Sequence, residues 1–209
     1  VVGPGIFTLG DPQSAAQYLR DFGEPPTRFF ATGENHNTPR LAARGGIPWT
    51  KQAWALALFL PGAVPFVHNG IEVLDKVPLN TGLCFSKEDL AALEGTPLGL
   101  FDAASFNWED GGADMIPFIA TTFAIHRKHS DLLTSMDGDS YKVANGLPEK
   151  VIGFYRLQEG TAKLGVFANT GNDDVALPIG KKGTDLLTGV SFDGTLTLAP
   201  MQVCVVELS

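Results

Sequence analysis

The sequence predicts a fold in two parts, an α/β part over residues 1–130 and an all-β part over residues 131–209. In the first part, nearly continuous apolar strands alternate with helices, which is typical of a parallel sheet. Polar clusters follow each of these strands, where the active sites of (β/α)8 barrels lie. A complete barrel needs about 250 residues, whereas only residues 1–130 precede the all-β part, and they show two strands. We therefore expect the C-terminal part of a (β/α)8 TIM barrel, its last strands and helices, followed by the all-β part. The second part is expected to be an antiparallel β-sandwich domain.

The first expected elements are a helix and a strand. Asp11 is expected to cap a short helix that begins at Pro12, because Asp suits the cap position and Pro suits the first turn. Gly23 ends this helix. Residues 27–32 follow as a buried strand, since they are rich in aromatic residues and bounded by Pro and Gly.

The same order of elements then repeats. A helix is expected over residues 50–60, with Thr50 as its cap, followed by a buried strand at 64–67. A short helix is expected at 87–93. A longer helix at 114–129 carries apolar residues on one side and a basic end, which suits the negative end of the helix dipole.

The all-β part consists of short alternating segments separated by turn signals such as Asp193-Gly194. We expect its strands at residues 151–157, 163–169, 174–177, 184–187, 195–198 and 203–208. This spacing of strands and turns is the basis for predicting a β-sandwich.

Composition excludes several classes of protein. Of the 209 residues, 44% are hydrophobic and 18% are charged, so a packed core is expected rather than disorder. The formal net charge of −8 argues against nucleic acid as a partner, because phosphate binding needs clustered Lys and Arg.

No apolar run reaches the roughly 18 residues of a membrane span, so no membrane partner is expected. No signal peptide is visible at Val1, and the compartment cannot be read from the start of the sequence, so the localisation is left unknown, a soluble protein that is either cytoplasmic or secreted. Two cysteines, Cys84 and Cys204, are too few for a disulfide framework, and we favour two buried thiols.

Two strand-end segments carry a resemblance to a known family. The segment Glu34-Asn35-His36-Asn37 resembles the region after the seventh barrel strand of the α-amylase family, glycoside hydrolase family 13, which usually reads Asn-His-Asp. Residues 61–72, with their Pro-Gly, Pro-Phe and final Gly-x-Glu, are similar to the eighth-strand segment of that family. The helix at 114–129 and the β tail look like the last barrel helix and the C-terminal domain of the family. The loop at 78–83 looks more like the maltosyltransferase-type members.

The resemblance implies a retaining enzyme that acts on α-1,4-glucans or maltooligosaccharides, by hydrolysis or by transglycosylation through the same covalent intermediate. It places the nucleophile Asp after the fourth strand and the acid Glu after the fifth, and neither strand is in this chain. It therefore implies a partner, the N-terminal part of the barrel in the same or an associated chain. No cofactor is expected here, and any calcium would be held by the missing segments.

Asn37 stands where the family has the Asp that stabilises the transition state. A carboxylate accepts charge-assisted hydrogen bonds, whereas an amide is neutral and offers one acceptor oxygen. Loss of one such transition-state interaction costs about 10²–10³ in rate. We therefore expect Asn37 to leave sugar binding largely intact and to impair turnover.

Four further residues are candidates for sugar binding. The resemblance assigns His36 as a hydrogen-bond donor to the sugar at the cleavage point. Glu34 either contacts sugar or is a solvated loop acid. His68 and Asn69 end the second strand and either line the sugar groove or pack locally. Arg40 is expected to tie its loop down by ion pairing rather than to meet the substrate.

Two classes of function are compatible with these residues. The first is part of an α-glucan-active glycosidase or transglycosidase, with the seventh- and eighth-strand loops as its share of the site. The alternative is a non-catalytic carbohydrate-binding or scaffold protein derived from the same fold, which Asn37 and the absent nucleophile and acid favour. The apolar faces and open edge that part of a barrel exposes favour the first, because they need the other strands as neighbours.

Overall fold

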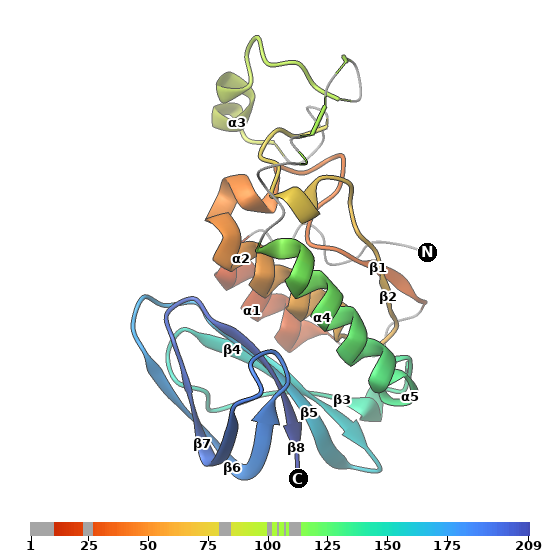
Figure 1. Cartoon of the computed structure of the whole chain (residues 1–209), viewed down its shortest axis with the longest axis vertical. Helices are drawn as coiled ribbons and strands as arrows, with labels where there is room; N and C mark the ends of the chain where they lie inside the picture. The colour runs from red at the N-terminus through yellow and green to blue at the C-terminus, as the bar shows by residue number, and fades with distance from the viewer. Residues whose placement is uncertain are drawn as a thin grey trace.

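The computed structural model describes residues 11–22, 27–79, 85–99, 102–103, 105–106, 108 and 114–209. Two sheets and a set of helices make up this part of the chain (Figure 1). Helix α2 contacts strands of both sheets, so it lies between them. This arrangement gives a mixed α/β chain with an antiparallel sheet at its C-terminal end.

The N-terminal half alternates helices and strands. Its elements are α1 (Pro12–Asp21), β1 (Phe29–Ala31), α2 (Leu41–Leu58), β2 (Ala63–Pro65), η2 (Ile71–Val73), α3 (Lys87–Ala92) and α4 (Met115–Lys128). Strands β1 and β2 pair in parallel, which confirms the sequence prediction. The carboxylate of Asp11 accepts a hydrogen bond from the backbone N–H of Ser14 and caps α1, also as predicted.

Helix α2 begins earlier than the sequence predicts. It starts at Leu41 because two helical segments join across a kink at Gly45 and Gly46. Gly46 has φ +65°, a left-handed conformation that favours glycine. The Thr50 hydroxyl donates to the Gly46 carbonyl from inside the helix. The prediction of Thr50 as an N-cap is therefore wrong, because the helical segment after the kink begins before Thr50.

The C-terminal half is built from strands. Its elements are α5 (Ser130–Leu133), η3 (Gly138–Ser140), β3 (Tyr141–Val143), β4 (Val151–Gln158), β5 (Thr161–Asn169), β6 (Val175–Asp185), β7 (Ser191–Leu198) and β8 (Val203–Leu208). They form one antiparallel sheet in the order β3-β4-β5-β8-β6-β7. The segments at 174–177 and 184–187, predicted as two strands, belong to the single strand β6, whose pairing with β7 shifts register between Pro178 and Lys182.

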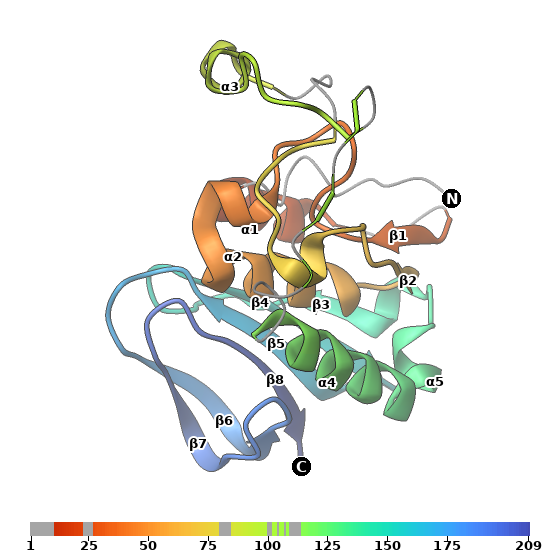
Figure 2. The ribbon, with the colours of Figure 1, turned by 45° about the horizontal axis from the view of Figure 1, so that its top comes forward.

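The predicted β-sandwich is corrected to this single sheet within the described residues, and both of its faces are apolar. On one face, Phe154 belongs to the same core as Trp54 of α2, and the helices lie on that side (Figure 2). On the other face, Phe167 packs in a second core with Leu177 and Leu196 of the β6–β7 hairpin. A strand that is buried on both faces has a continuous apolar run, as in β8, whereas β7 alternates between exposed and less exposed residues. Neither pattern shows how β6 pairs with β8, so the sequence alone does not separate one sheet from a sandwich.

Arg156 of β4 joins the two halves of the chain. Its buried guanidinium donates to the backbone carbonyls of Phe59 and Leu132 at 2.9 Å each, and its Nε donates to Ser140 at 3.0 Å. Burial lowers the pKa of Arg156 to about 10. One buried cation therefore satisfies carbonyls at the end of α2, in α5 and in η3, which fixes the sheet against the helices.

Two sequence predictions concern single residues and spans. Cys204 is buried in β8, where burial raises the pKa of its thiol, and Cys84 lies outside the described residues. In the described part of the chain, no helix is both long and apolar enough to cross a bilayer.

Candidate functional site

The loop between β1 and α2 carries His36 and Asn37. The backbone N–H of Asn37 donates to the side-chain oxygen of Asn35 at 2.8 Å, and the backbone N–H of Thr38 donates to the Asn35 carbonyl at 3.2 Å. Asn favours such turns because its side chain bonds the backbone two residues on. The turn leaves His36 exposed and Asn37 half-buried, and their predicted roles stay predictions.

Glu34 lies buried in the same loop, with 1% of its surface exposed. One carboxylate oxygen accepts from Arg40 Nη1 at 2.7 Å, and the other accepts from the backbone N–H of Leu41 at 2.6 Å. A buried carboxylate needs such donors, because desolvation of an unpaired charge is costly. The alternative of a solvated acid is therefore wrong, and a sugar contact of Glu34 is untested. The prediction that Arg40 ties the loop down by ion pairing is confirmed.

The loop after β2 reaches the same guanidinium. Arg40 Nη2 donates to the backbone carbonyl of Asn69 at 2.7 Å, and the Nδ1 atom of His68 lies 2.6 Å from Nη1. Asp75 adds a carboxylate oxygen 3.6 Å from Nη2. His68 is buried, whereas Asn69 is exposed. The structure thus brings together the two loops that the sequence places at the carboxyl ends of the parallel strands.

A cavity of about 390 Å³ lies beside Asn69. Asp75 and Phe106 contribute to its wall, together with Val77, Pro78, Leu79, Thr96, Pro97, Gly99, Ala103 and Ser105. The Phe106 ring lies 5.6 Å from the Arg40 guanidinium carbon, a cation–π contact, and Trp108 contacts Phe106 edge-on at 5.8 Å. Sequence reasoning missed Phe106, because no local pattern shows that it packs on an arginine 66 positions earlier.

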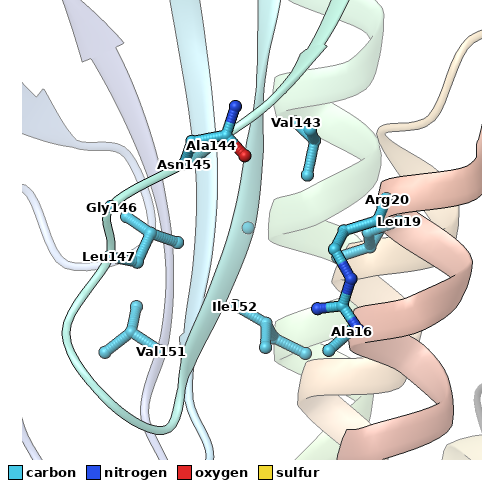
Figure 3. Close-up of a pocket in the computed structure, with 11 residues that line it drawn as sticks. Ala16, Leu19, Arg20, Val143, Ala144, Asn145, Gly146, Leu147, Val151 and Ile152 are labelled. Carbon is cyan, nitrogen blue, oxygen red and sulfur yellow. The ribbon is translucent and has the colours of Figure 1, made fainter.

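Another cavity, of about 220 Å³, lies between α1 and the β3–β4 loop (Figure 3). Ala16 and Arg20 of α1 face Ile152 across it. Its lining contains no aromatic side chain among the described residues and shares none with the two strand-end loops. We therefore treat it as separate from the candidate site.

The histidines at the end of α4 do not form a metal site. His129 Nε2 lies 3.5 Å from a carboxylate oxygen of Glu207, which is a pair rather than a ligand set. Among the residues that the structure describes, no group of three or more His, Cys, Asp or Glu side chains could hold a metal ion. Burial lowers the pKa of both His126 and His129. The expectation that the chain needs no cofactor stays a prediction.

Comparison with known proteins adds evidence at the level of the fold. No protein-family model matches the sequence, and no curated protein matches it. The pullulanase of Anoxybacillus sp. LM18-11, solved with maltotetraose, aligns with a TM-score of 0.65 and 14% identity over 97% of this chain and 32% of its own. The trehalulose synthase MutB of Pseudomonas mesoacidophila MX-45 aligns with a TM-score of 0.63 and 17% identity, over 97% of this chain and 47% of its own.

An α-amylase from Lactobacillus plantarum aligns over 86% of this chain and 38% of its own, with a TM-score of 0.57 and 17% identity. These solved structures are enzymes of the α-amylase family. The chain spans less than half of their length. The chain therefore has the fold that α-amylase-family enzymes have over a third to a half of their length, as its strand-end motifs predict.

Proposed function

We propose that this chain supplies the end of a (β/α)8 barrel and one wall of the sugar site in a retaining enzyme that acts on α-glucans. In this proposal β1 and β2 are the seventh and eighth barrel strands. The observation that carries it is the joining of the two strand-end loops, because Arg40 binds Glu34 of one loop and Asn69 of the other. In barrels, the loops at the carboxyl ends of the strands build the active site.

The sugar class rests on the solved neighbours. Structures with maltose, maltotriose and maltotetraose are among those that this chain resembles in fold. The loop after β1 would contribute His36 as a donor to a sugar hydroxyl and the Asn37 amide as a neutral partner. The loop after β2 would contribute Asn69, which is exposed beside the cavity lined by Phe106. Polar groups on an aromatic-lined wall suit a sugar, which has both hydroxyls and apolar faces.

The nucleophile and the general acid would come from the N-terminal part of the barrel, in the same or an associated chain. The apolar surface of β1 and β2 supports this partner. Phe30 is 40% exposed, and its ring lies 4.7 Å from that of Phe66. Neighbouring barrel strands would cover both rings, because buried parallel sheets are apolar on both faces.

Asn37 favours a second candidate function, sugar binding without turnover. A retaining reaction passes through a positively charged transition state that a carboxylate stabilises better than an amide does. A protein with Asn at this position could hold an α-glucan and release it unchanged. Hydrolysis and transglycosylation share the covalent intermediate, so both stay within the proposal.

A calorimetric titration tests the proposed function on the protein that also contains the N-terminal part of the barrel, because this chain supplies only one wall of the site. We expect maltotetraose to bind and cellotetraose, its β-linked counterpart, to bind at least tenfold more weakly. His36→Ala should weaken maltotetraose binding by about fivefold, since a hydrogen bond contributes roughly 1 kcal/mol. Asn145→Ala, in the loop beside the separate cavity, is the matched control and should leave the affinity unchanged. Equal binding of the two tetrasaccharides, or none, contradicts the proposal.

A further inference from the structure

Arg40 is a buried cross-link between two loops that are far apart in sequence. Its Nη1 donates to Glu34 at 2.7 Å, and its Nη2 donates to the Asn69 carbonyl at 2.7 Å. Glu34 is in turn fixed to the start of α2 through the backbone N–H of Leu41. The planar guanidinium presents its donors in a fixed fork, so these contacts set the distance between the loops.

The loop after β2 is shaped to accept this guanidinium. Gly70 has φ +95°, and a Cβ atom there would overlap Arg40 Nη2 and lie 2.8 Å from a ring carbon of Phe106. Any side chain at position 70 would therefore displace Arg40. The absence of a side chain at Gly70 is what allows the cross-link to form.

The contact with His68 determines where its proton lies. Nδ1 of His68 is 2.6 Å from Arg40 Nη1 and 3.3 Å from the carboxylate of Glu34. A guanidinium nitrogen can only donate, and two N–H groups cannot face each other at 2.6 Å. Nδ1 must therefore accept, so the ring is neutral and carries its proton on Nε2. In the described part of the chain, no hydrogen bond to Nε2 is present, and the residue keeps 7% of its surface exposed.

We propose that Arg40 is a positioning residue that fixes His68 as its Nε2–H tautomer, and that this N–H donates to a sugar hydroxyl. The second half of this statement rests on the proposed function. A donor whose tautomer and orientation are set before binding costs no rearrangement when the sugar arrives. Glu34 and Arg40 then serve the sugar site without touching the sugar.

The tautomer is tested first, without sugar, by ¹H–¹⁵N correlation spectra of the chain with ¹⁵N-labelled histidine near pH 7.5. We expect a pyridine-type Nδ1 and a pyrrole-type Nε2 for His68. Arg40→Gln should shift His68 toward the Nδ1–H tautomer, because the carboxylate of Glu34 then becomes its nearest acceptor. Arg40→Lys keeps the charge and should restore the wild-type pattern at least in part. Arg44→Gln makes the same charge change one helical turn later and is the matched control.

A wild-type His68 with its proton on Nδ1, or with protons on both nitrogens, overturns the inference even if no variant folds. An unchanged pattern in a folded Arg40→Gln variant overturns the role of Arg40. These outcomes do not depend on any sugar.

Titration with maltotriose, on the protein that also contains the N-terminal part of the barrel, tests the second half. His68→Phe should weaken binding about tenfold, whereas His68→Gln, which keeps an N–H donor, should lose less. If the wild-type chain binds maltotriose and His68→Phe binds it equally well, the donor role is wrong and the proposed function stands. If the wild-type chain binds no maltotriose, the donor role falls together with the proposed function, and the tautomer result stands alone.

Discussion

At the scale of single residues, the chemistry of the proposed site depends most on position 37. Asn37→Asp, in the protein that also contains the N-terminal part of the barrel, should raise turnover of maltooligosaccharides by about 10²–10³ because a carboxylate stabilises the charged transition state. Affinity for the substrate should change far less. Initial rates of maltotetraose cleavage measure the effect, with Asn145→Asp as the charge-matched control. No rise in turnover would mean that position 37 does not face the reacting sugar.

His126 makes stability depend on pH. Burial and the nearby charge of Arg156 lower its pKa below the ordinary value of 6.5. Below about pH 6.5 the unfolded chain therefore binds a proton that the folded protein does not, so the free energy of unfolding falls as the pH drops. Replacing the imidazole of His126 should therefore reduce the loss of stability at low pH. Part of the loss should remain, because burial also lowers the pKa of His129.

Urea unfolding of His126→Phe from pH 7.5 to pH 5 checks this prediction. The variant should lose less stability than the wild type over this range. Ile125→Leu, a buried neighbour without a titrating group, is the control and should follow the wild type. Parallel pH curves for His126→Phe and the wild type would show that the ring is protonated equally in both states.

At the scale of elements, the turn after β2 depends on Gly70. Gly70→Ala should lower the free energy of unfolding by about 1 kcal/mol for its positive φ, and by about 1–3 kcal/mol more for the overlap with Arg40. Gly146→Ala isolates the first cost, because φ is +68° there and no atom of the described residues lies within 4 Å of the added Cβ. The urea midpoints of the two variants give the comparison. Equal losses would mean that the Arg40 cross-link tolerates a side chain at position 70.

Elements with strong local signals could be predicted from the sequence. The Asp11 cap, the parallel strands β1 and β2, and most strands of the large sheet follow from caps, apolar runs and turns. The strand β3 was not predicted, because three residues show no period and its pairing with Arg156 is a long-range contact. The single sheet could not be separated from a sandwich, since that distinction depends on how β6 pairs with β8.

The candidate site could be predicted only where its residues are close in sequence. The position of Asn37 and the ion pairing of Arg40 follow from one short segment. The contact of Arg40 with His68, and its stacking on Phe106, join separate loops and need the fold. Glu34 is an example of what the sequence does not show, because a carboxylate in a loop is expected to be solvated unless its buried partner, here Arg40, is known.

At the scale of the whole molecule, the surface of β1 and β2 should drive association when the chain is isolated. The Phe30 and Phe66 rings contact each other beside a two-stranded sheet, and strands with an open edge and an apolar face tend to pair with strands of another chain. Sedimentation velocity of the 209-residue chain should show a species larger than the monomer, and Phe30→Ser should reduce it. Val190→Ser, at an apolar side chain that is 54% exposed elsewhere, should not. A wild-type monomer at every concentration would contradict the need for neighbouring strands.

The central claim is that α-glucan binds where the loops after β1 and β2 meet. Backbone NMR spectra of the protein that also contains the N-terminal part of the barrel, recorded during titration with maltotriose, test it most directly. The account predicts shifts at the amides of residues 33–40 and 68–75, while the cleft between α1 and the β3–β4 loop stays unchanged. Shifts gathered at that cleft, or spread over the large sheet, would contradict it.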